Sequence, residues 1–181
     1  MNPNLPPHVA WLLCLGEIMN TVRRKGLLAI EVELSMPASD GSPFRQHPAL
    51  LRQPYLDFAR DLLRLRLGGF DDMALMETYA QTAMVTLTRR NWLGLRRADP
   101  TLLNTIWLTL RAFCEGWAPA VACDFGRQAI PAHLRPDFDT LEELLAEARR
   151  MASKLKSASP DEPRDLEAEA DSFIESLSRP S

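Results

Sequence analysis

The chain has 181 residues, of which 46% are hydrophobic and 25% are charged, and its formal net charge is −3. This length predicts one domain, or one domain with a tail, and the apolar fraction is sufficient for a packed core. The slightly negative charge argues against nucleic-acid binding, which usually requires a basic surface. The chain has only three cysteines, which are too few and too scattered for a disulfide framework, so we expect a cytoplasmic protein.

The apolar runs are too short for a transmembrane helix, which needs roughly 20 mostly apolar residues. The run 9–15 is interrupted by Gly16 and Glu17, and the run 106–113 contains Arg111. The first residues carry no basic side chain and no small-residue cleavage pattern, so they do not resemble a signal peptide. We therefore expect a soluble chain that makes at most peripheral contact with a membrane.

Helical periodicity dominates the first part of the chain, and no segment is typical of a strand. We expect a long first helix over 9–34, although Gly26 lies inside it. The stretch 36–43 is rich in proline, glycine and serine and predicts a loop. One or two short helical turns are expected over 44–53.

Proline, glycine and aspartate mark the boundaries of two further helices. Pro54 predicts the start of one helix, and Gly68 and Gly69 predict its end. Asp71 or Asp72 is expected to cap the next helix. The inward side chains of this second helix should be Met76, Tyr79, Ala83, Met84 and Leu87.

Two helices are expected in the remaining part of the core. One begins at Asp99 and Pro100 and is apolar on most sides as far as Trp117, which predicts deep burial. Pro119 should kink or end this helix, because proline removes a backbone hydrogen bond. The other begins at Asp139, where Glu142 would complete a capping box.

The predicted fold is all-α, an elongated bundle of about five or six helices over 1–156, followed by an acidic tail over 157–181. The composition of the tail is typical of a disordered or solvated segment. An apolar stripe at helical spacing also allows a short docking helix there. Its candidate contact residues are Leu166, Phe173, Ile174 and Leu177.

No constellation of residues in the sequence is typical of an enzyme. The tripeptide Asp124-Phe125-Gly126 matches a kinase motif, but no glycine-rich loop, strand lysine or catalytic loop accompanies it. The histidines are scattered, and no spacing fits a zinc site. We interpret the cysteines as buried small hydrophobic residues. The sequence thus predicts neither catalysis, nor a metal, nor a cofactor.

Two stretches carry a resemblance to a known family. The first contains Thr21-Val-Arg-Arg-Lys-Gly-Leu-Leu-Ala-Ile-Glu31 and continues through 43–51 and 56–69. The second covers 110–130 and 134–143 and contains a Phe-Gly-Arg followed by an Arg-Pro-x-Phe. Together they resemble the cytoplasmic parts of the flagellar stator protein MotA (motility protein A). The matching structural positions are Gly26, Pro119, Phe125, Gly126, Arg127, Arg135, Pro136 and Phe138.

The chain also departs from the MotA pattern. The resemblance places two membrane helices before the first stretch and two more between the stretches. Here only ten residues precede Trp11, and the segment between the stretches contains the charged run 89–97. The membrane prolines that the family uses in proton coupling have no counterpart. We therefore expect no proton-conducting pore, and the pentamer of the stators is in doubt, although a homo-oligomer remains an option.

What the resemblance implies is contact with the rotor. In MotA a pair of charges in the first stretch acts on charges of the rotor switch protein FliG. The corresponding residues here are Arg23 and Glu31, and Arg24 and Lys25 extend the basic patch. On a continuous helix Arg24 and Glu31 would lie on one stripe. The alternative interpretation of these charges is an ordinary solvated helix face.

The resemblance therefore implies a non-enzymatic motor protein, at the inner membrane near the flagellar motor, that binds FliG or stator subunits and modulates motor assembly or torque. Two alternatives stay open: a scaffold or adaptor subunit of another bacterial envelope machine, and a proton-driven stator subunit whose membrane helices have been deleted. A basic, aromatic connector could contact a membrane surface or a partner, or could simply pack on the core. Its residues are Arg89, Arg90, Trp92, Arg96 and Arg97.

Overall fold

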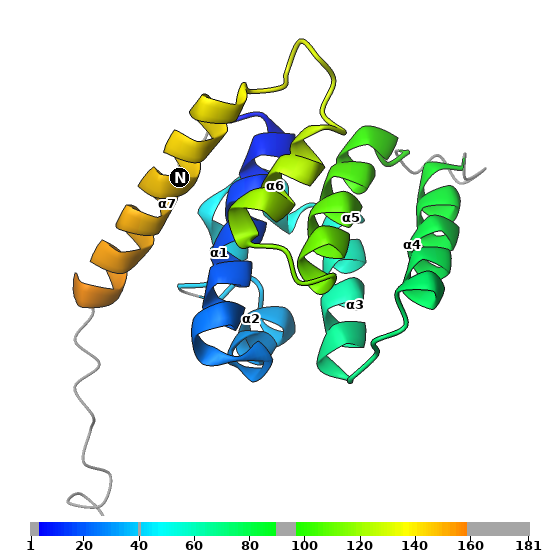
Figure 1. The fold of residues 1–181 in the computed structure, drawn as a ribbon, viewed down its shortest axis with the longest axis horizontal. Helices are drawn as coiled ribbons and strands as arrows, with labels where there is room; N and C mark the ends of the chain where they lie inside the picture. The colour runs from blue at the N-terminus through cyan, green and yellow to red at the C-terminus, as the bar shows by residue number, and fades with distance from the viewer. Residues whose placement is uncertain (1–3, 40, 90–96, 159–181) are drawn as a thin grey trace, which may run out of the picture. The chain divides into compact units, whose positions relative to one another are not determined.

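The computed structural model describes residues 4–39, 41–89 and 97–158 (Figure 1). Every regular element in these ranges is a helix, which confirms the all-α prediction. The α-helices number seven in the described residues, one or two more than expected, and short 3₁₀ turns accompany them. The elements are α1 (Pro7–Lys25), η1 (Leu27–Ile30), α2 (Glu31–Ser35), η2 (Pro43–Gln46), η3 (Pro48–Leu51), α3 (Tyr55–Leu67), α4 (Met73–Thr88), α5 (Pro100–Cys114), α6 (Pro119–Arg127) and α7 (Phe138–Ala158).

The chain divides into two compact units with a boundary inside α7. The first unit is Met1–Arg149 and the second is Arg150–Ser181. The first unit contains α1 to α6 and the initial turns of α7. Of the second unit, the structure describes only the helical residues that end α7.

The core of the first unit is built around α1, which is buried on all sides from His8 to Gly16. It packs against α5, α6 and the two 3₁₀ turns η2 and η3. The ring of Trp11 meets the ring of Phe44 from η2 edge-on, with centroids 6.1 Å apart, which is a favourable aromatic geometry. A helix that is apolar all round requires such cover, and its neighbours supply it.

Glycine at position 126 allows α6 to approach α5 and α1 closely. A Cβ built there would collide with the Thr109 side chain, lie 2.8 Å from the Thr105 carbonyl oxygen and lie 2.9 Å from Cδ2 of Leu12. Only a residue without a side chain fits this crossing. This contact fixes the position of α6 in the core.

The structure corrects the first predicted helix. It ends at Lys25 rather than near residue 34, because Gly26 adopts a φ of 85° and a ψ of 169°, which are not helical angles. The 3₁₀ turn η1 and the separate short helix α2 follow. Gly26 is therefore a break, which the continuous-helix prediction did not include.

The second half of the chain brings three further corrections. The helix that starts at Pro100 ends at Cys114, and Pro119 does not end it but occupies the first turn of α6, where proline needs no backbone partner. Trp117 lies between the two helices and is exposed rather than deeply buried. The last helix, α7, begins at Phe138 and is capped not by Asp139 but by Asp137, whose carboxylate accepts a hydrogen bond from the Thr140 backbone N–H at 2.7 Å.

The remaining boundary predictions are confirmed or nearly so. Asp72 caps α4 by accepting a hydrogen bond from the Leu75 backbone N–H at 3.0 Å. Tyr79 was expected to face inward from α4 but is exposed.

Two of the three cysteines, Cys14 and Cys123, are buried, whereas Cys114 is only partly buried.

Candidate functional site

The basic corner consists of Arg23, Arg24 and Lys25 in the last turn of α1 together with Glu31, the first residue of α2. All four are exposed. Within the described part of the chain, none of them forms an ion pair; Arg24 Nε donates a hydrogen bond to the Asn20 carbonyl oxygen at 3.3 Å. The break at Gly26 separates the cations from Glu31, so Arg24 and Glu31 do not share a stripe of one helix as the sequence suggested.

The motifs of the second stretch are tied to each other. Arg127 Nε donates to Asp124 Oδ1 at 2.6 Å, and its Nη1 donates to the Pro136 carbonyl oxygen at 3.2 Å. In the opposite direction, Arg135 Nε donates to the Ile130 carbonyl oxygen at 2.9 Å. These hydrogen bonds hold the loop between α6 and α7 in place, so both arginines have a structural role.

The aromatic residues near these motifs are exposed. Trp117 and Phe125 are 51% and 46% exposed, and their ring centroids are 6.3 Å apart. Val121 lies one turn from Phe125 on α6 and is exposed as well. Phe138, at the start of α7, is also exposed. This apolar surface was not anticipated from the sequence, because Trp117 was assigned to a buried helix.

Several other predicted site residues lie outside the described residues. These are three residues of the connector, Arg90, Trp92 and Arg96, and the whole set in the tail: Leu166, Phe173, Ile174 and Leu177. Arg89 and Arg97 are described, and both are exposed. Of the connector and tail residues, the structure thus describes these two arginines alone. Across residues 4–39, 41–89 and 97–158, no helix is long and apolar enough to cross a membrane.

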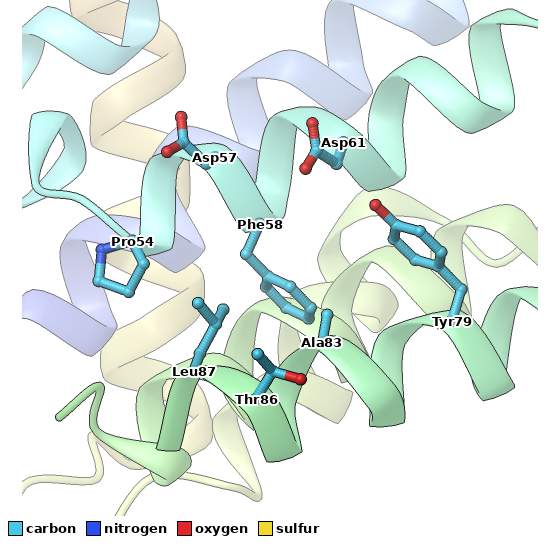
Figure 2. Close-up of a pocket in the computed structure, with 8 residues that line it drawn as sticks. All are labelled: Pro54, Asp57, Phe58, Asp61, Tyr79, Ala83, Thr86 and Leu87. Carbon is cyan, nitrogen blue, oxygen red and sulfur yellow. The ribbon is translucent and has the colours of Figure 1, made fainter. Parts of the chain in front are cut away.

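A groove between α3 and α4 was missed by sequence reasoning. This α3–α4 groove has a volume of about 250 Å³ (Figure 2). A second hollow of about 460 Å³ continues it and shares Asp61 and Tyr79. The lining residues of the α3–α4 groove are Pro54, Asp57, Phe58, Asp61, Tyr79, Ala83, Thr86 and Leu87.

The side chains of the α3–α4 groove divide into an apolar floor and a polar edge. Figure 2 shows Phe58 pointing from α3 towards α4, and Leu87 and Tyr79 pointing from α4 towards α3. Partial burial and the negative charge of Asp61 raise the pKa of Tyr79, so its hydroxyl stays protonated and can donate a hydrogen bond. The only sequence signal for the groove was Tyr79, a polar aromatic residue in an otherwise apolar stripe.

A partly buried polar cluster, in which His8 is the buried member, joins the N-terminal ends of α1 and α5. The Thr101 hydroxyl donates to Asp99 Oδ1 at 2.7 Å, and His8 Nε2 lies 3.0 Å from the same hydroxyl oxygen. Because the hydroxyl hydrogen points to Asp99, His8 Nε2 is the donor in its bond to Thr101. Burial lowers the pKa of His8, although the charge of Asp99 opposes that effect. Burial raises the pKa of Asp99, but hydrogen bonds from Thr101 outweigh it and hold that pKa below its ordinary value.

The arrangement of this cluster is that of a helix cap. Asp99 Oδ1 also accepts a hydrogen bond from the Thr101 backbone N–H at 2.8 Å, as an N-cap residue does. No described pocket borders His8, Asp99 or Thr101. The cluster therefore ties α1 to α5.

Thiol and metal chemistry find little support among the described residues. Burial raises the pKa of Cys14, and it raises the pKa of Cys123 to about 12. A thiol with a raised pKa is a poor nucleophile and a poor metal ligand, because both roles need the thiolate. In the described part of the chain, no three histidine, cysteine or acidic residues come together in a way that could hold a metal ion.

Comparison with known proteins does not assign a function to these surfaces. No family model, no curated protein and no solved structure matches the chain. Any functional assignment must therefore come from the chemistry of the basic corner and of the α3–α4 groove.

Proposed function

We propose that this chain is a non-enzymatic protein that resembles the cytoplasmic part of MotA and binds the flagellar rotor switch protein FliG or stator subunits, thereby modulating motor assembly or torque. The observation that carries this proposal is the exposed basic corner, where Arg23, Arg24 and Lys25 have no acidic partner among the described residues. Such unpaired surface charges can steer and orient a charged partner, because complementary charge controls association rate and register more than affinity.

The geometry at Gly26 favours a corner rather than a stripe as the contact surface. Since Gly26 ends α1, the three cations stand at a helix end, and Glu31 starts the next α-helix after one 3₁₀ turn. A partner would therefore meet the two signs of charge on two short elements. Charges of opposite sign on separate elements define an orientation that a single basic patch would not.

The competing explanation is local. Cations in the last turn of a helix and anions in the first turn are each stabilised by the helix dipole, by about 0.3–1 kcal/mol. The basic corner would satisfy this rule without any partner. The experiment must therefore separate binding from helix stability.

The test is the binding of the purified chain to the C-terminal domain of FliG at low and at high salt. We expect binding that weakens at high salt, because screening reduces the attraction of exposed charges. Reversing both signs with Arg23→Glu and Glu31→Lys should weaken binding about five- to tenfold, since each exposed pair contributes only about 0.2–1 kcal/mol and reversal adds repulsion.

The matched control for the Arg23→Glu step is Arg52→Glu, which makes the same charge change as that single substitution at an exposed residue outside the basic corner. Thermal unfolding of each variant measures the loss of helix stability separately. If the domain does not bind at low salt, or if the doubly reversed variant binds as tightly as the Arg52→Glu control, the rotor contact is wrong.

A further inference from the structure

The α3–α4 groove has one charged edge and one uncharged edge. Asp57 and Asp61 lie on α3 one helical turn apart, which is about 6 Å along the axis. The groove residues of α4 are Tyr79, Ala83, Thr86 and Leu87, none of which is charged at neutral pH. A ligand in the groove would therefore meet carboxylates on one side only.

The arginines of α3 point elsewhere and leave this edge acidic. Arg60 Nε and Arg64 Nη2 donate to the Leu34 carbonyl oxygen, at 2.7 Å and 3.3 Å, and so face α2. Asp57 is partly compensated, by Arg60 Nη1 at 3.7 Å and by a hydrogen bond of 3.0 Å from Gln53. Asp61 has no hydrogen bond or ion pair among the described residues. Arg64 lines only the adjoining hollow.

The outer surface of α4 extends the uncharged edge. Leu75 and Tyr79, which lie one turn apart on α4, are 55% and 41% exposed. The only charged residue of α4 is Glu77, whose carboxylate accepts a hydrogen bond from Arg111 of α5 at 3.0 Å. Apolar surface of this kind next to a pocket is typical of an interaction site.

From these observations we propose that the α3–α4 groove docks a basic amphipathic helix of a protein partner. An apolar side chain of that helix packs against Phe58 and Leu87, and an arginine one turn away reaches Asp57 and Asp61. The groove shares no residue with the basic corner, so the proposal does not depend on the rotor contact.

The chemistry of the edge favours arginine over lysine. A guanidinium group has five donors in a fixed plane and can bond two carboxylates at once, whereas an ammonium group is a point charge. The same planar group can stack on the exposed ring of Tyr79. The apolar floor of the groove then binds the apolar side chains of the partner helix, because docking helices place apolar anchor residues a turn apart in a groove.

The test uses a phage-displayed library of helical peptides, selected on the full chain in the presence of excess Asp57→Asn/Asp61→Asn protein as a competitor. We expect the enriched peptides to carry an arginine one turn from a leucine, isoleucine or phenylalanine. A synthetic copy of the leading peptide should bind the Asp57→Asn/Asp61→Asn variant about tenfold more weakly than the wild type, because charge-assisted hydrogen bonds are lost.

Two further variants sharpen the result. Ala83→Trp fills the floor of the groove and should also weaken the peptide, whereas Glu142→Gln/Glu143→Gln removes the same charge from exposed positions on α7 and should not. Binding of the FliG domain should be unchanged in the groove variants, which separates this proposal from the previous one. Asparagine has the shape of aspartate, so the double variant remains informative if Ala83→Trp fails to fold.

The proposal is overturned if no peptide is enriched, if the enriched peptides lack a cation, or if the double asparagine variant binds them equally well. It is also overturned if sedimentation shows the wild type self-associating and Ala83→Trp abolishing that association. In that case the occupant of the groove is a second copy of the chain.

Discussion

Helices α4 and α5 are similar in composition and opposite in burial. Each contains one charged residue, Glu77 in α4 and Arg111 in α5, and these two side chains bond to each other at 3.0 Å. Yet α5 buries most of its apolar side chains, while α4 buries only Met76 and Ala80. The difference lies in their neighbours: α5 contacts α1, α3, α4 and α6, whereas α4 contacts α5 and, more sparsely, α3 (Figure 1). Similar stretches of sequence thus serve as a core in one place and as an exposed surface in another.

The largest expected effect comes from replacing a leucine of α5 by alanine, and the same replacement in α4 serves as the comparison. Leu103 of α5 is fully buried, so Leu103→Ala should lower the free energy of unfolding by about 2–5 kcal/mol through lost burial and a residual cavity. Leu75 of α4 is 55% exposed, so Leu75→Ala should change it by less than about 0.5 kcal/mol. Denaturant unfolding measures both. Equal losses would mean that α4 supports the fold as much as α5 does.

A smaller effect is expected at the closest helix crossing. Gly126→Ala places a methyl group against Thr109 and the Thr105 carbonyl oxygen, and overpacking of this kind costs about 1–3 kcal/mol. The control is Gly68→Ala at the end of α3. There the nearest atoms to a new Cβ are two carbonyl oxygens at 3.5 Å, an ordinary contact, and φ is −72°.

The two glycine variants are compared by thermal unfolding. We expect a lower midpoint for Gly126→Ala and little change for Gly68→Ala. A Gly126→Ala protein as stable as the wild type would show that α6 can move away from α5 without a loss of stability. This result would contradict the close packing of α6 against α5.

Sequence reasoning located the helices where local chemistry marks their ends. Asp72 and Pro100 were identified correctly because a capping carboxylate or a first-turn proline acts within a few residues. It failed at Gly26, because the apolar periodicity continues on both sides and only the backbone angles show the break. It failed again at Pro119, since a proline can end one helix or start the next, and neighbouring residues do not decide between them.

The candidate sites show the same limit. Exposure of the basic corner follows from the charges themselves, but the placement of Glu31 on a separate helix from Arg23 was not predicted. The α3–α4 groove depends on how two helices from different parts of the chain are spaced, which no local pattern records. Tyr79 illustrates this point: its helical spacing matched the inward stripe, but α3 does not approach closely enough to cover it.

The contrast between α4 and α5 also applies to their polar groups, and it leads to the smallest expected effect. The threonines of α4, such as Thr78 and Thr82, bond to carbonyl oxygens of their own helix, whereas Thr101 of α5 is bonded across to His8 of α1. Since His8 is buried and its pKa is lowered in the folded state, the unfolded chain binds a proton more readily. Stability should therefore be greatest above the ordinary histidine pKa of 6.5 and decrease as the pH falls below it, until the folded protein is also protonated.

The slope of the decrease cannot exceed about 1.4 kcal/mol per pH unit, because one proton is involved. Urea unfolding over a pH series measures it, with His8→Gln as the test variant and His133→Gln, which removes an exposed imidazole, as the control. We expect His8→Gln to flatten the profile just below pH 6.5 and His133→Gln to retain it. A further loss is expected below pH 3.8 from Asp99 and Asp137, because the pKa of each carboxyl is lowered from that ordinary value in the folded protein. A wild-type profile that is level below pH 6.5 would mean that folding does not shift the pKa of His8, because the attraction of Asp99 then offsets the effect of burial.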